Sequence, residues 1–417
     1  MDGARRTILI VTGILMSLGV VMVYSASFVF AEKSFGSPTY FLQRHAIYLL
    51  AGCMALAVTS LLDYHMLTRH WKWFVGLSLI LVASVLVPGV GHKINGARRW
   101  FSLGGLTFQP SEAAKPLMIL GIAGFVVHAK ENISTLWHGF VPGAMLVGAV
   151  VVLTAMEPDL GSAGLLACVL CAMLFVGGIK LSYAIPAFLI TMPLGALVAY
   201  SKLQYIQLRI LNWWEGSADP LKQGYQINQA MMAQGSGGIF GAGLGQGHSK
   251  LLFLPEAHND FIFALIGEEL GLIGTLSILT LFALFVIQGW RVARRAPDLL
   301  GTLIALGVTL CIGLQAAINV AVVTHSMPTK GISLPFVSYG GSSLIFTLAA
   351  VGMLLNVAAH PACDALPPTL GAVRRKRDTR LWTKSSSRTP VISEPAASKR
   401  SAKVKAVVAE PQHSDIN

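Results

Sequence analysis

Long, continuously apolar runs recur along this 417-residue sequence, and they constrain its fold more than any other feature. A helix needs roughly 17–25 apolar residues to cross the hydrocarbon core of a bilayer, and the runs reach that length. Because they do not alternate between polar and apolar residues, they predict helices rather than the strands of a β-barrel. The charged fraction of 12%, about half that of a soluble domain, agrees with a chain that lies largely in lipid. The predicted spans are residues 7–30, 46–62, 73–90, 113–129, 139–156, 163–179, 182–200, 261–290, 299–323 and 343–359.

The sequence therefore predicts an all-α integral membrane protein, a polytopic bundle of about ten transmembrane helices. A long loop at 201–259 separates helices 7 and 8 and contains a short predicted helix at 226–232. The membrane domain covers residues 1–360. Residues 361–417 form a predicted disordered tail with eleven Lys and Arg against five Asp and Glu. Such a tail attracts anionic lipid, and nucleic acid is not an expected partner because no folded reader of bases accompanies it.

Basic residues in the short loops predict the orientation of the bundle. They precede the first span or follow every second one, and the positive-inside bias assigns that side to the cytoplasm. Both chain termini are then cytoplasmic, and the long loop is extracytoplasmic. The residues that carry this bias are Arg5, Arg6, Arg69, Lys72, Lys130, Lys180, Arg291, Arg294, Arg295 and the four basic residues at 374–377.

A cluster of ionisable residues lies at the start of the eighth span. Glu256, His258 and Asp260 precede the apolar run that begins at residue 261, and Glu268 and Glu269 lie inside it. A carboxylate in hydrocarbon is costly unless it is paired, hydrated or protonated, so such a cluster indicates a functional site. The alternative is that these groups are polar residues satisfied by neighbouring helices.

Cations on the predicted outer side favour an anionic ligand. Arg98 and Arg99 lie in the loop before the fourth span, Lys250 in the long loop, and Lys330 between spans nine and ten. Basic groups kept there against the positive-inside bias are suited to a phosphate or pyrophosphate. Long loops also translocate whatever their charge, which is the alternative for Lys250.

Three other outer segments have patterns of their own. Glu112 and Lys115, three residues apart at the start of the fourth span, are expected to form an ion pair with a structural or regulatory role. The glycine-rich stretch 235–247 is compatible with a backbone cradle for phosphate or with a flexible lid. Segment 328–343 contains two prolines and three glycines, which predicts non-helical backbone enclosed by protein or by a wet cavity.

The motifs in these segments closely resemble, in type and order, those of the SEDS family of shape, elongation, division and sporulation proteins. The resemblance covers residue 6 to about residue 360, and Pro328-Thr-Lys-Gly331 is more similar to the division branch than to the elongation branch. The motifs are Gly96-Ala-Arg-Arg-Trp100, Phe108-Gln-Pro-Ser-Glu112, Glu157-Pro-Asp-Leu-Gly161, Gly235-Ser-Gly-Gly238, Leu254-Pro-Glu-Ala-His258 with Asp260-Phe-Ile-Phe263, and Ser338-Tyr-Gly-Gly-Ser342.

The resemblance implies a peptidoglycan glycosyltransferase of the bacterial inner membrane that polymerises lipid II, at the division septum for a division-branch member. It also implies a class B penicillin-binding transpeptidase and other divisome proteins as partners. A divalent cation, Mg²⁺ or Mn²⁺, would share the neutralisation of the pyrophosphate, but the sequence assigns it no ligands. The expected roles are Asp260 as general base, Arg99, Lys330, Arg98 and Lys250 at the pyrophosphate, and Glu256, His258 and Ser338 as further substrate-binding residues.

Three other functions stay open from the sequence. A lipid II flippase is one, an elongation-type polymerase is the second, and a non-catalytic scaffold is the third. A flippase is expected to carry broken helices and charges near the bilayer midplane, with access from both sides. The predicted charges instead gather at the outer surface, which favours the polymerase.

Overall fold

The computed structural model describes residues 2–94, 97–103, 106–187, 189, 207, 213–214, 225–248 and 258–360. Most of the predicted seventh span and the whole predicted tail lie outside these residues. The same holds for two candidate site residues, Lys250 and Glu256, and for the side chain of Arg98.

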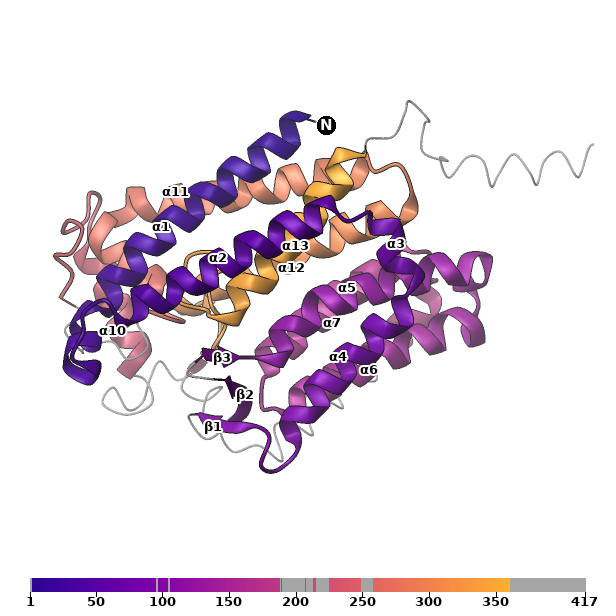
Figure 1. The fold of residues 1–417 in the computed structure, drawn as a ribbon, viewed down its shortest axis with the longest axis horizontal. Coiled ribbons are helices and arrows are strands. Elements are labelled where there is room, and N and C mark those ends of the chain that lie inside the picture. The colour runs from indigo at the N-terminus through magenta and orange to yellow at the C-terminus, as the bar shows by residue number, and fades with distance from the viewer. Residues whose placement is uncertain are drawn as a thin grey trace, which may run out of the picture. The chain divides into compact units, whose positions relative to one another are not determined.

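Most of the described residues are helical, which confirms the predicted helical membrane fold (Figure 1). Among the described residues, seven helices are long and apolar enough to cross a membrane, and two shorter apolar helices accompany them. Nine of the ten predicted runs thus coincide with a described helix. Residues 181–187, at the start of the remaining run, are also helical. The nine helices are α1 (Asp2–Phe35), α2 (Tyr40–Leu61), α4 (Trp71–Leu86), α5 (Pro110–Ala129), α6 (Val141–Met156), α7 (Leu160–Val176), α11 (Ile262–Arg294), α12 (Leu299–Val323) and α13 (Ser342–Ala359).

Two short helices and two tight helical turns also lie within the described residues. Helix α3 (Tyr64–Arg69) follows α2, and α10 (Tyr225–Ser236) contains the short helix predicted within the long loop. A 3₁₀ turn (Lys130–Ser134) and a π turn (Leu136–Phe140) join α5 to α6.

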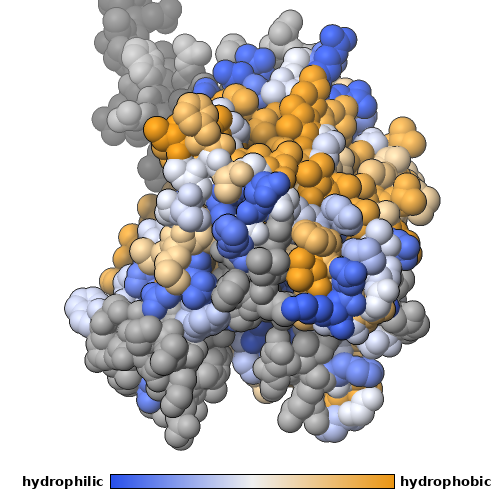
Figure 2. All heavy atoms as spheres, turned by 90° about the vertical axis from the view of Figure 1, so that its left-hand side faces the viewer, coloured by the Kyte–Doolittle hydropathy of each residue, from blue (hydrophilic) through white to orange (hydrophobic). Residues whose placement is uncertain are grey.

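Helices α5, α12 and α13 are the most enclosed spans, whereas α2 and α6 leave most of their surface outward. Helix α13 packs on α2, α5 on α4, and α11 on both α1 and α12 (Figure 1). Apolar outer surfaces suit a bilayer, where neighbouring lipid replaces neighbouring protein. On the end of the bundle that carries α10, hydrophilic residues interrupt this apolar surface (Figure 2).

A small antiparallel sheet occupies the loop before α5, where the all-helical prediction contained no strand. Its strands are β1 (His92–Ile94), β2 (Ala97–Leu103) and β3 (Leu106–Phe108), in the order β1-β2-β3. Phe101 of β2 pairs with Phe108 of β3, and their rings stack with centroids 6.2 Å apart. Aromatic cross-strand pairs of this kind stabilise short hairpins, which have too few residues to produce a periodic sequence signal.

Candidate functional site

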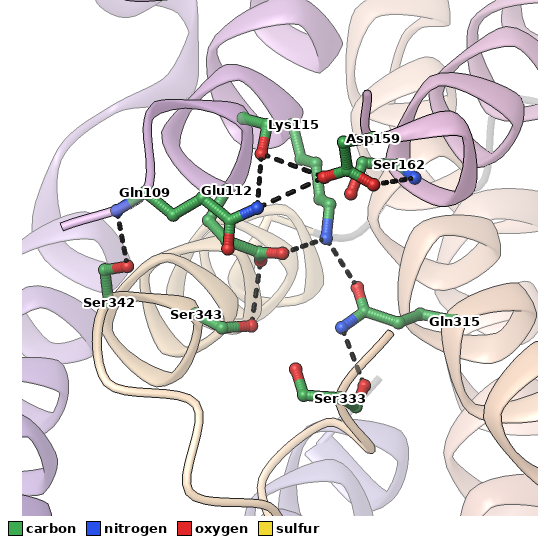
Figure 3. Close-up of polar contacts among 10 residues, drawn as sticks. Gln109, Glu112, Lys115, Asp159, Ser162, Gln315, Ser333, Ser342 and Ser343 are labelled. Atoms are coloured by element: carbon green, nitrogen blue, oxygen red, sulfur yellow. Dashed lines mark hydrogen bonds and ion pairs between the residues drawn. The ribbon is translucent and has the colours of Figure 1, made fainter. Parts of the chain in front are cut away.

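A buried polar network joins α5, α7, α12, α13 and the segment between the last two helices (Figure 3). At its centre the Nζ of Lys115 donates to Oε1 of Glu112 at 2.7 Å and to Oε1 of Gln315 at 2.9 Å. The other carboxylate oxygen of Glu112 accepts from Ser343 Oγ at 2.8 Å. Glu112 and Lys115 are only 6% and 4% exposed, so the ion pair expected from their spacing is present and is desolvated.

Asp159 extends this network to the start of α7. Its Oδ1 accepts from the backbone N–H of Ser162 at 3.1 Å, which makes it the N-cap of that helix. Its Oδ2 accepts from Gln109 Nε2 at 3.1 Å and from Ser111 Oγ at 3.4 Å. The Glu157-Pro-Asp motif and the Gln109-Pro-Ser motif are therefore in direct contact.

Two amide side chains one turn apart on α12 hold the segment that follows the helix. Gln315 Nε2 donates to the carbonyl of Ser333 at 3.1 Å. Asn319 Nδ2 donates to the carbonyl of Ile332 at 2.7 Å and to the carbonyl of Asp260 at 2.9 Å. Asn319 is 1% exposed and thus ties the candidate base to the Pro328–Gly331 motif region from inside the bundle. Neither residue stands out in the sequence, because both lie within an otherwise apolar span.

Asp260 lies in the turn that leads into α11 and is half-buried. Its carboxylate faces Gly331, where a Cβ would lie 3.0 Å from Oδ2. Lys330 precedes that glycine and is also half-buried. The structure thus brings Asp260 against the segment that carries Lys330, two candidates that are 70 positions apart in the sequence.

His258 and Ser338 make contacts that shape the backbone next to Asp260. The carbonyl of His258 accepts from the N–H of Tyr339 at 2.9 Å, and its ring packs among Phe30, Phe41 and Tyr339. Ser338 is 3% exposed, and its Oγ accepts from the N–H of Leu334 at 2.9 Å. These contacts close the turn at 334–338 and join it to the start of the α11 segment.

Arg99 lies on β2 and reaches the turn between α6 and α7. Its Nε donates to the carbonyl of Glu157 at 2.8 Å, and its Nη2 donates to the carbonyl of Pro158. The guanidinium thus binds two backbone oxygens and uses two of its five N–H donors for them.

The glycine-rich stretch is inserted into α11 at a kink. The helix breaks at Gly271 (φ 68°, ψ −163°). In an unbroken α-helix, the N–H groups of Leu272 and Ile273 would donate to the carbonyls of Glu268 and Glu269. All four backbone groups instead bind the stretch. Leu272 N donates to Gly238 O at 3.0 Å, Ile273 N to Ile239 O at 3.3 Å, Ala242 N to Glu268 O at 2.9 Å, and Gly243 N to Glu269 O at 3.0 Å.

The carboxylates of Glu268 and Glu269 bind the same stretch and the residue that follows it. Glu268 Oε1 accepts from the N–H of His248 at 2.6 Å, and Glu269 Oε2 accepts from the N–H of Gly245 at 3.1 Å. Glu269 also accepts from Ser25 Oγ of α1 at 2.6 and 2.8 Å. These two members of the carboxylate cluster are therefore satisfied inside the bundle, which is the alternative that the sequence left open. The N–H groups that hold the stretch on α11 are not available to a phosphate.

No three His, Cys, Asp or Glu side chains come together as a metal site in the part of the chain that the structure describes.

Apolar helices that enclose an ion pair, with a half-buried carboxylate at the start of a span, define an integral membrane protein with a polar site inside its bundle. The family within this class follows from sequence comparison. The model of the FtsW, RodA and SpoVE family, described as "Cell cycle protein", matches residues 5–362, and the chain belongs to this family.

Relatives match over most of their length. The chain is 43% identical over 346 residues to "Probable peptidoglycan glycosyltransferase FtsW" of Trichlorobacter lovleyi, which covers 83% of this chain and 90% of that protein. It is 39% identical over 356 residues to "Stage V sporulation protein E" of Bacillus subtilis, with 85% and 96% covered. The relatives named FtsW agree with the predicted similarity to the division branch.

Two solved structures share the fold. One is described as "Structural coordination of polymerization and crosslinking by a peptidoglycan synthase complex", with a TM-score of 0.70, 30% identity, and 86% of this chain and 98% of that chain covered. The other is the crystal structure of the rod shape determining protein RodA of Thermus thermophilus, with a TM-score of 0.61, 29% identity, and 84% and 95% covered.

Proposed function

We propose that this protein is a peptidoglycan glycosyltransferase that polymerises lipid II for the septal wall during cell division. Membership of the family and the similarity to proteins named peptidoglycan glycosyltransferase FtsW support this activity. The observation that carries the chemistry is the position of Asp260, a half-buried carboxylate in the turn that begins α11 and next to the segment of Lys330.

Asp260 acts as the general base in this proposal. It takes the proton of an acceptor sugar hydroxyl as that oxygen bonds to the anomeric carbon of the donor. The bond from that carbon to the pyrophosphate oxygen breaks, and undecaprenyl pyrophosphate leaves with the electron pair. Asn319 and Gly331 position Asp260, because one binds its carbonyl and the other leaves space for its carboxylate.

Cations around the leaving group stabilise the charge that develops on it. Arg99 and Lys330 are the proposed pyrophosphate ligands among the described side chains, with Arg98 and Lys250 beside them. His258, Glu256 and Ser338 keep their proposed places around the substrate. A divalent cation would, when bound, share this neutralisation, and no step here depends on one.

Both chain termini are proposed to be cytoplasmic, with Asp260 and Arg99 on the opposite side, since the short-loop cations favour that orientation. Labelling of a single cysteine at position 294 from outside the cell, without labelling at position 99, would contradict it. The similarity to a peptidoglycan synthase complex that coordinates polymerisation and crosslinking supports a crosslinking partner of the penicillin-binding class, within the divisome.

The test is synthesis of glycan strands from lipid II by purified protein in detergent, alone and with its transpeptidase. Asp260→Asn, which is nearly isosteric, should lower the rate by roughly 100-fold or more while leaving folding and lipid II binding intact. A matched control is Asp63→Asn, a half-exposed carboxylate beside α3, at the end of the bundle opposite α10 (Figure 1), which should polymerise normally. Full activity of Asp260→Asn would refute the assignment, and loss of lipid translocation with normal glycan synthesis would favour a flippase.

A further inference from the structure

Glu157, in the turn between α6 and α7, has a buried carboxyl group that forms no hydrogen bond with the described residues. Its side chain is 0% exposed. Neither carboxyl oxygen accepts or shares a hydrogen bond with any residue that the structure describes. An ionised carboxylate in this position would lose its hydration and gain no donor in exchange, a cost of several kcal/mol, so the neutral acid is the stable form.

Two charged groups act on Glu157 from the elements packed around it. Burial, together with the nearby charge of Asp159, raises the pKa of Glu157 to about 8, against a smaller lowering by Arg99. The carboxylate of Asp159 already accepts hydrogen bonds from Ser162, Gln109 and the hydroxyl of Ser111.

Arg99 is the positively charged residue next to Glu157. It is held by the carbonyls of Glu157 and Pro158, which fix its direction without cancelling its charge. Within the described residues it has no ion pair. A guanidinium bound in this way keeps its full charge and three further N–H donors for an anion, and it suits bidentate binding of phosphate oxygens.

We propose that Glu157 is a protonated positioning residue that leaves the charge of Arg99 available to the diphosphate of a lipid-linked sugar, and that its ionisation quenches this charge. The identity of the ligand rests on the proposed function. Glu157 does not touch the reacting atoms and is not a catalytic residue. Its carboxyl group would pair with Arg99 once ionised, and the anion would then compete with the diphosphate for the same guanidinium.

The experiment measures the Kd of geranyl pyrophosphate for the full-length purified protein in detergent between pH 6 and 9.5. One pH unit above a pKa near 8, about one tenth of the Glu157 population stays protonated, so the Kd should rise about tenfold at pH 9. Glu157→Gln is neutral at every pH, and its Kd should change less than about twofold beyond the change caused by titration of the ligand. Glu32→Gln, which neutralises an exposed carboxylate on α1, is the matched control and should follow the wild type.

Thermal unfolding gives a second readout that needs no ligand. The pKa of Glu157 in the folded state lies above its ordinary value of 4.5, so this group costs the wild type stability as pH rises from about 4.5 to 8. Glu157→Gln should lack that loss. Glu157→Met, an apolar replacement of similar length, should behave in the same way, and failure of both variants to fold would overturn a role based on charge alone.

The outcomes separate this inference from the proposed function. An alkaline rise in Kd that persists in Glu157→Gln, or no binding by the wild type at pH 7, overturns the inference even if lipid II is polymerised. A rise that the variant abolishes supports it even if no polymerisation is found. The Kd of inorganic pyrophosphate should rise with pH in the same way, from a higher starting value. Tighter binding of that free anion than of geranyl pyrophosphate would contradict a lipid-linked ligand.

Discussion

Replacement of Asn319 by Leu tests whether the interior of the bundle positions Asp260. The single Nδ2 of Asn319 donates to two carbonyls, those of Asp260 and Ile332, at 2.9 and 2.7 Å. Leu has the same branching and the same number of side-chain heavy atoms but no donor, so both carbonyls lose their partner inside protein. Each such loss costs about 1–3 kcal/mol, or about 2–6 kcal/mol for the pair.

The structure relieves that cost most simply if the Asp260 turn and the Ile332 segment move apart toward other donors. A displacement of about 1 Å at a catalytic group lowers the rate on the order of 100-fold. We therefore expect kcat for lipid II polymerisation to fall about 100-fold with KM changed less than about threefold. Asn319→Asp should be worse than Leu, because its carboxylate would face two carbonyl oxygens instead of donating to them.

Asn356 provides the matched control for this prediction. It is also a buried Asn of a span, its Nδ2 donates to the carbonyl of Ser60 at 2.8 Å, and its Oδ1, like that of Asn319, has no partner among the described residues. Asn356→Leu should lower the melting temperature and leave kcat near that of the wild type. Equal losses of kcat in both Leu variants would show a general loss of stability, and unchanged kcat in folded Asn319→Leu would refute the positioning role.

Two further changes test the buried charges and the inserted loop. Glu112→Ala or Lys115→Ala should each destabilise the protein by roughly 3–5 kcal/mol by leaving a buried charge unpaired, and the exchanged pair Glu112→Lys with Lys115→Glu should recover part of this, as followed by thermal unfolding in detergent. No recovery would mean that their other partners decide the effect. Gly271→Ala should lower stability by roughly 2 kcal/mol or more, because φ is positive and a Cβ would overlap Gly241 N. The control is Gly148→Ala in α6, where a Cβ meets nothing within 4 Å, and equal melting temperatures would contradict the inserted loop.

The membrane fold was predictable because each span is a local property of the sequence. A run of apolar residues identifies its own helix, and α10 and the Glu112–Lys115 pair likewise follow from residues close in the chain. The partners of Glu269 were not predictable in this way. Its carboxylate binds Ser25, which is 244 positions away, and no periodicity connects the two residues.

The inserted loop could not be predicted for a related reason. From the sequence alone, Gly271 is expected to be an ordinary glycine within a helix, and the glycine-rich stretch is expected to be a flexible loop. Each is explained only by the other, since the kink frees backbone groups that the stretch then satisfies. Gln315 and Asn319 were overlooked because two amides in a 25-residue apolar helix hardly change its hydropathy.

Several charged residues of this chain fall into two groups, according to the protein atoms to which they hydrogen-bond. Glu112, Lys115, Glu268 and Glu269 are at most 6% exposed, and protein donors or acceptors hold each of them. Buried charged groups whose hydrogen bonds are all made within the protein stabilise one arrangement of the helices. They have few donors or acceptors left to bind a substrate. Arg99, by contrast, is half-buried, and in the part of the chain that the structure describes it binds carbonyls alone, which fixes its direction and preserves its charge. The proposed diphosphate site needs a charged residue such as Arg99, held in place by a framework of buried, hydrogen-bonded residues. The polar network that begins at Asp159 and ends at the carbonyl of Asp260 is such a framework.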